Sequence, residues 1–201
     1  MFNFDLESSR EPFRFSGSLP CMSQKLNYNS TFRPDSTNHS LNACLGYNIC
    51  EWGTIARGFQ AAANNLVTHV GHHEPDLDGM IYPIAFLFRH AIETTLKIAI
   101  VSTGTESVPP TNHFLLEMWD RMQPNVSKRF ASDPAYLNLS EVRDILKDFE
   151  SIDRSSMAFR YPTQKDGNTQ LQGIDVINVG VLSERANRLI ELLDRIIGAF
   201  S

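Results

Sequence analysis

Apolar side chains recur at three- and four-residue steps from about residue 49 to the end of the chain. This is the spacing of one face of an α-helix, because an α-helix turns by about 100° per residue. The pattern covers Ile55 to Val70 and returns in segments near residues 80–102, 111–124, 140–150 and 182–200. No segment shows the sustained alternation that is typical of a β-sheet. The sequence therefore predicts an all-α bundle of about five helices.

Local signals predict where these helices begin and end. Gly71 is a plausible stop for the first helix. The third is expected to begin after Thr111 and to end at Pro124, because proline cannot donate a helical hydrogen bond. Ser140 is expected to cap the fourth. A run of β-branched residues, Val176 to Val181, leaves the start of the fifth helix open.

Residues 1–48 differ from the rest of the chain. They are rich in Ser and Asn, contain Pro and Gly, and lack helical periodicity. Within them EPFRFSGSL alternates briefly and predicts a short strand. We expect an irregular N-terminal arm over residues 1–48 and one helical domain over residues 49–201.

Charge limits the partners that the chain can bind. With 18 Lys and Arg against 23 Asp and Glu, the net charge is -5. A chain of this charge does not coat nucleic acid through overall positive charge, so any RNA contact has to be local.

Cysteine usage and the apolar runs bear on location. Cys21, Cys44 and Cys50 form no CxxC pair and are odd in number, which suits reduced thiols that serve in packing. The start of the chain carries acids where a signal peptide needs bases, and the run MIYPIAFLF stops at Arg89, short of a membrane span. We expect a soluble, cytoplasmic protein with no membrane contact.

The segment FLFRHAIETTLK places four polar side chains on a helix that is otherwise apolar. Arg89, His90, Glu93 and Lys97 fall within one arc of about 100°. They could form a solvated strip held by i,i+4 ion pairs. Alternatively, since Phe86 shares the arc, they could line a cleft or a subunit interface. In that case Arg and His together suit an anion, because one is a permanent cation and the other exchanges a proton near neutral pH.

Three segments taken together resemble the HEPN superfamily: YPIAFLFRHAIETTLK, HFLLEMWD, and SIDRSSMAFRYP followed by an amphipathic helix. The resemblance covers about residues 49–199. It implies a small helical bundle, usually a homodimer, of the kind found in prokaryotic toxin–antitoxin and antiviral defence systems, which associates with RNA or a nucleotide or with an operon partner protein. Active members are metal-independent endoribonucleases, and others are non-catalytic modules for dimerisation or partner binding.

In active members an arginine is followed after four to six residues by a histidine. Arg160 takes the arginine's place, but no histidine follows it within that spacing. For such a variant the resemblance implies either a binding or partner member, or a nuclease in which His90 or His113 supplies the imidazole from another helix. Arginine can stabilise the charged transition state while histidine moves the proton. The predicted catalytic residues are Arg160, His90 and Arg89, and the predicted binding residues are Glu93, His113, Tyr161 and Asp153. Asp153 is also expected to hold the turn that positions Arg160.

Two other patterns in the sequence resemble functional sites. HVGHHEPDLD places His69 and His73 one helical turn apart with acids close behind, which could ligate a divalent ion. Because no second ligand cluster occurs elsewhere, we expect no metal and no other cofactor. RPDSTNH, Arg33 to His39, has the ribonuclease spacing but lies in the arm, so we interpret it as a chance match.

Overall fold

The computed structural model describes residues 30–43, 51–72, 77–132, 137–164 and 166–201. The chain forms two compact units, Met1–Leu45 and Gly46–Ser201. Within the first unit the described residues form one 3₁₀ turn, His39–Leu41. The predicted strand EPFRFSGSL and the three cysteines lie outside the described residues.

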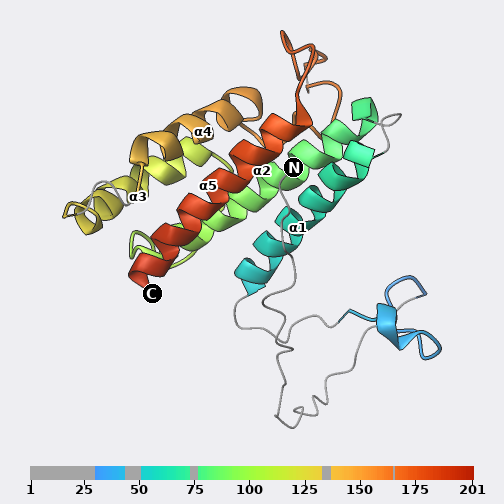
Figure 1. Cartoon of the computed structure of the whole chain (residues 1–201), viewed down its shortest axis with the longest axis horizontal. Helices are drawn as coiled ribbons and strands as arrows, with labels where there is room; N and C mark the ends of the chain where they lie inside the picture. The colour runs from blue at the N-terminus through green and yellow to red at the C-terminus, as the bar shows by residue number, and fades with distance from the viewer. Residues whose placement is uncertain (1–29, 44–50, 73–76, 133–136, 165) are drawn as a thin grey trace, which may run out of the picture. The chain divides into compact units, whose positions relative to one another are not determined.

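The second unit is a bundle of helices (Figure 1). They are α1 (Glu51–His72), α2 (Leu77–Ser102), α3 (Leu115–Arg129), α4 (Leu139–Ile152) and α5 (Val179–Phe200). In the part of the chain that the structure describes, extended pairing is limited to one isolated bridge between Thr163 and Thr169. The prediction of an all-α bundle of five helices is therefore confirmed.

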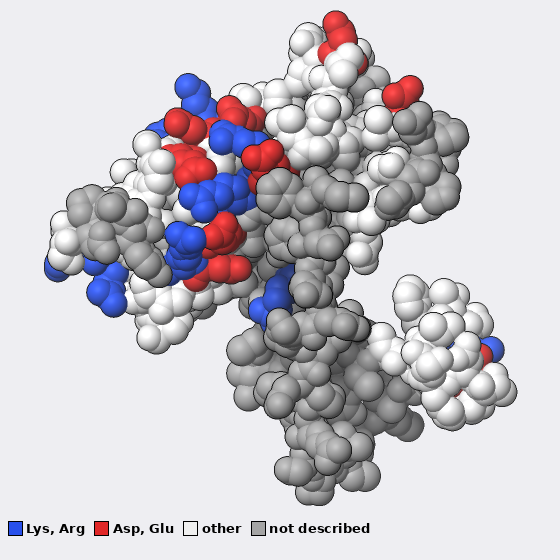
Figure 2. Space-filling model, in the orientation of Figure 1, with Lys and Arg blue, Asp and Glu red and all other residues white. Residues whose placement is uncertain are grey.

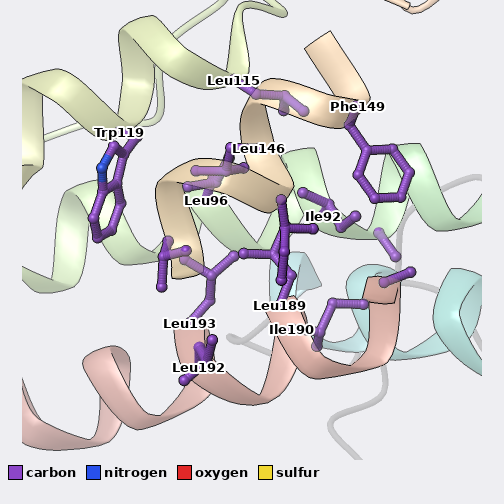
Figure 3. Packing of buried hydrophobic residues seen from close by; sticks show 14 of the residues in the cluster. Ile92, Leu96, Leu115, Trp119, Leu146, Phe149, Leu189, Ile190, Leu192 and Leu193 are labelled. Atoms are coloured by element: carbon purple, nitrogen blue, oxygen red, sulfur yellow. The ribbon is translucent and has the colours of Figure 1, made fainter. Parts of the chain in front are cut away.

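Helix α2 lies at the centre of the bundle and packs against α1, α3 and α5, while α4 packs against α3 and α5. The buried residues of α2 extend around most of its circumference, as the sequence predicts. Figure 3 shows α2 side chains such as Ile92 and Leu96 among apolar residues of the other helices, including Trp119, Leu146 and Leu189. Burial of these apolar side chains supplies the main driving force for folding. None of the described helices is both long enough and apolar enough to cross a membrane.

The predicted end of α3 is wrong. Pro124 does not end α3 but lies inside it, and the helix continues to Arg129. Proline removes one backbone donor, but Met122 and Val126 on either side of it are fully buried. Tertiary packing therefore holds the helix together across the proline.

The caps of α3 and α4 also differ from the prediction. Phe114 rather than Thr111 is the N-cap residue of α3, without a side-chain cap bond. The N-cap of α4 is Asn138, whose side-chain oxygen accepts a hydrogen bond from the backbone N–H of Glu141. Ser140 instead donates its hydroxyl to that same asparagine oxygen. At α5, Asn178 caps the helix by accepting from the N–H of Val181.

Candidate functional site

The polar strip of α2 is buried. Arg89 is 0% exposed, Glu93 2% and Lys97 7%, so the expectation of a solvated strip is wrong for these three residues. The Glu93 carboxylate lies between the two cations, 3.1 Å from Arg89 Nη1 and 2.9 Å from Lys97 Nζ. Buried charges are stable only when they are paired and hydrogen-bonded. This strip is therefore an internal ion network.

Arg89 connects three parts of the chain. Its Nη1 donates to Glu93, its Nη2 donates to the backbone oxygen of His113 at 2.7 Å, and its Nε donates to the backbone oxygen of Asp153 at 3.3 Å. Burial lowers the pKa of Arg89, while the charges of Glu93 and Asp153 oppose that change. All three guanidinium nitrogens thus bind groups of the protein itself. Arg89 fixes the segment before α3 and the segment after α4 onto α2.

Glu93 is the centre of the network. Besides Arg89 and Lys97 it binds His113, whose Nδ1 lies 2.7 Å from Glu93 Oε1. Burial raises the pKa of the Glu93 carboxyl, but the hydrogen bonds from Lys97 and His113 and the charges of Lys97 and Arg89 together outweigh it. The pKa consequently lies below the ordinary value, and Glu93 is ionised at neutral pH.

His90 lies among aromatic side chains. Its ring packs edge-on against Phe59 of α1, with centroids 4.3 Å apart, and stacks on Phe86 at 5.9 Å. Burial among these rings lowers the pKa of His90, with smaller contributions from neighbouring charges. His90 is therefore a neutral imidazole at pH 7, a form that can accept a proton.

The loop after α4 is held by Asp153. This carboxylate is 2% exposed, and its Oδ1 accepts hydrogen bonds from the backbone N–H groups of Met157 and Ala158, at 2.7 and 3.0 Å. Ser156, which immediately precedes these two residues, has a φ of 61°, a left-handed conformation that is uncommon for a residue other than glycine. These contacts fold the loop into a tight turn that leads directly to Arg160.

Arg160 is exposed at the end of this turn, and its guanidinium is held in place. Its Nε donates to the Ser156 backbone oxygen at 2.8 Å, and its Nη2 lies 2.6 Å from Met157 Sδ. Its Cζ lies 5.5 Å from the ring centroid of Phe86 and 5.8 Å from that of Tyr161. No carboxylate among the described residues forms an ion pair with it. Arg160 thus presents an unneutralised cation close to two aromatic rings.

The predicted site residues fall into two groups. Arg160 and His90 both contact the Phe86 ring, and Tyr161 contacts Arg160. Arg89, Glu93 and His113 form the internal network, which also holds the Asp153 backbone. The loop after α4 contacts α2 in both groups, through Arg160 at Phe86 and through the Asp153 backbone at Arg89.

Sequence reasoning missed the rings that complete the first group. Phe59 and Phe86 contact His90 from α1 and α2, and Phe86 also contacts Arg160. The sequence places Phe59 in a helical pattern and Phe86 on the polar arc, but spacing does not show which polar side chain packs on either ring. The left-handed Ser156 carries no sequence signal, since serine rarely adopts this conformation.

A metal site is not formed by the residues that the structure describes. Among them no group of three or more His, Cys, Asp and Glu side chains could hold an ion. His73, Glu74 and Asp76 of the weighed metal pattern lie outside the described residues. Arg33 and His39 are exposed in the first unit.

The charged surface of the helices is of a different kind. Figure 2 shows acidic and basic side chains interspersed over the face made by α3, α4 and α5. Several of its arginines are paired with carboxylates, as in Arg143 with Asp120 and Arg188 with Glu141. Such a face is close to neutral and attracts a polyanion weakly.

No protein-family model matches the chain, and no curated protein and no solved structure matches it.

Proposed function

We propose that the protein is a HEPN-like module of a prokaryotic defence or toxin–antitoxin type system, acting in the cytoplasm, which associates with RNA or a nucleotide through Arg160. The observation that supports this proposal is the exposed Arg160 guanidinium close to the Phe86 and Tyr161 rings. An unpaired arginine binds a phosphate, and neighbouring aromatic rings offer faces on which bases stack. In a chain of net charge -5, a local cation of this kind is what an RNA contact requires.

Fluorescence anisotropy with a short labelled single-stranded RNA tests this proposal. We expect Arg160→Ala to weaken binding by about tenfold and to reduce the slope of log affinity against log salt by about 0.7, the contribution of one phosphate contact. Arg143→Ala is the matched control, because Arg143 is an exposed arginine that is already paired with Asp120. Equal affinities for the wild type and Arg160→Ala would rule out Arg160 as the contact.

The catalytic form of the proposal is a metal-independent endoribonuclease. Here His90, held neutral and in contact with the same Phe86 as Arg160, would take the proton of the attacking 2′-hydroxyl. Arg160 would stabilise the charge that develops on the phosphate. The expected products are a 2′,3′-cyclic phosphate and a 5′-hydroxyl end, formed in the presence of a chelator and lost in Arg160→Ala and His90→Gln. Intact RNA with the wild type would contradict catalysis but not binding.

A second candidate function is a non-catalytic module that dimerises or binds a partner protein. An apolar groove of about 400 Å³ between α4, α5 and the preceding loop favours it. Two valines at this groove, Val176 and Val181, are 88% and 58% exposed. If a second copy of the chain covers the groove, Val181→Glu will convert a dimer to a monomer in light scattering, with RNA binding retained by each subunit.

A further inference from the structure

An open cleft adjoins the loop that carries Arg160. It has a volume of about 1170 Å³, and its lining includes Phe114, Asp153, Arg154 and Tyr161. The Arg154 guanidinium lies over the Phe114 ring, 4.9 Å from its centroid. Tyr161 joins the cleft to Arg160, because it lines the cleft and its ring also contacts that guanidinium. The cleft is large enough for a nucleotide.

Asp153, which lines this cleft, carries one oxygen without a hydrogen-bond donor. Its Oδ1 holds the loop, but its buried Oδ2 has no hydrogen-bond partner in the described part of the chain. A buried carboxylate oxygen without a donor is costly, and most buried polar atoms are paired. Asp166 also lines the cleft but differs, since both its oxygens accept hydrogen bonds from Asn168.

We infer that this cleft binds the base of a nucleotide and that Asp153 Oδ2 accepts a hydrogen bond from an exocyclic amino group of that base. This inference rests on the proposed function, because the phosphate of the same nucleotide binds Arg160. The base enters between Tyr161 and the Arg154–Phe114 pair, where the Arg154 and Tyr161 side chains are exposed, and reaches Asp153, which lines the same cleft. A carboxylate oxygen is an acceptor only, so the site favours bases that carry an amino group over bases that offer only acceptors there.

Two ligands of equal size test the inference in the wild type. Adenosine 5′-monophosphate carries the amino group, and purine riboside 5′-monophosphate lacks it and has no other donor on that edge. We expect the first to bind about 10- to 100-fold more tightly, as for a hydrogen bond to a charged group. Equal affinities would overturn the inference. This comparison needs no variant.

Asp153→Asn provides the matched variant. The amide oxygen can still accept from Met157 and Ala158, so the loop is retained, but the second oxygen becomes an NH₂ donor. The variant should lose the preference for adenosine 5′-monophosphate and favour purine riboside 5′-monophosphate, with thermal unfolding measured as the check on folding. An unchanged preference in a folded variant would also overturn the inference.

The outcomes separate the two proposals. If neither nucleotide nor RNA binds, or if Arg160→Ala leaves binding intact, the proposed function fails. If binding depends on Arg160 but the two nucleotides bind equally well, the phosphate contact is supported and the inference that the cleft binds the base is wrong.

Discussion

At the scale of single residues, Glu93 binds three side chains at once. Arg89, Lys97 and His113 all contact its buried carboxylate. Removing one charge from a buried ion network leaves the others unpaired, which costs about 3–5 kcal/mol. We therefore expect Glu93→Gln to lower the free energy of unfolding by about 3 kcal/mol at pH 7, measured by urea denaturation.

The pH dependence of this effect has a definite sign. The pKa of Glu93 is lowered from the ordinary value of 4.5, so its contribution is complete above that pH and is lost as the pH falls through the folded-state pKa. The difference between the wild type and Glu93→Gln should shrink in this acidic range. Glu191→Gln is the control, because Glu191 pairs with Arg188 and Arg195 at the surface, where solvent screens the charges and the loss should have a much smaller effect. Equal effects of the two substitutions would contradict the network.

His90 supplies a second prediction at this scale. Its pKa is lowered from the ordinary value of 6.5 by burial, so an NMR titration should place its midpoint below 6.5. The unfolded chain then binds a proton more readily, and stability from this residue is lost as the pH falls below 6.5. Phe59→Ala should expose the ring and raise the midpoint towards 6.5. A midpoint at or above 6.5 in the wild type would remove the support for a neutral imidazole.

Part of the site could be predicted from residues alone. Helical spacing placed Arg89, Glu93 and Lys97 on one arc, and the DRSS motif indicated a turn held by Asp153. Whether that arc faces water or protein depends on which elements cover it. The backbone oxygens of His113 and Asp153, which bind Arg89, are brought there by tertiary contacts that no local pattern contains.

At the scale of elements, the turn between α4 and Arg160 depends on an unusual backbone. Ser156 has a φ of 61° and is buried, and its backbone oxygen binds Arg160 Nε. A β-branched side chain is strongly disfavoured in this conformation. We expect Ser156→Val to cost about 1–3 kcal/mol of stability and to weaken RNA binding.

Ser156→Gly is the matched substitution, because glycine adopts the same conformation without strain. It should stay within about 1 kcal/mol of the wild type and keep RNA affinity. Urea denaturation and anisotropy measure both effects. If valine is tolerated as well as glycine, the left-handed turn is not what positions Arg160.

The helices themselves follow closely from the sequence, and their ends do so less well. The apolar face of each helix is dictated by local spacing, which is why all five were predicted. Pro124 shows why a boundary signal fails: losing one backbone donor is a local cost, while burial of Met122 and Val126 is a tertiary gain. The choice of Asn138 over Ser140 as a cap similarly depends on where α4 meets the core.

At the scale of the whole molecule, the two kinds of surface on the bundle differ in what they can bind. The face of α3, α4 and α5 is laced with paired charges. The loop of residues 153–161 instead presents an unpaired arginine with aromatic neighbours. The surface with paired charges attracts a polyanion only weakly, while the unpaired arginine and its aromatic neighbours offer a local contact.

Chemical-shift mapping of RNA on the isotope-labelled protein tests this distinction most directly. On addition of a short single-stranded RNA, the largest shifts should occur at the backbone amides of Met157, Arg160 and Tyr161 and at the ring of Phe86, while Arg188 and Arg195 of α5 remain unchanged. Shifts centred on α5, or no shifts at all, would contradict the claim that the Arg160 loop is the RNA-binding surface.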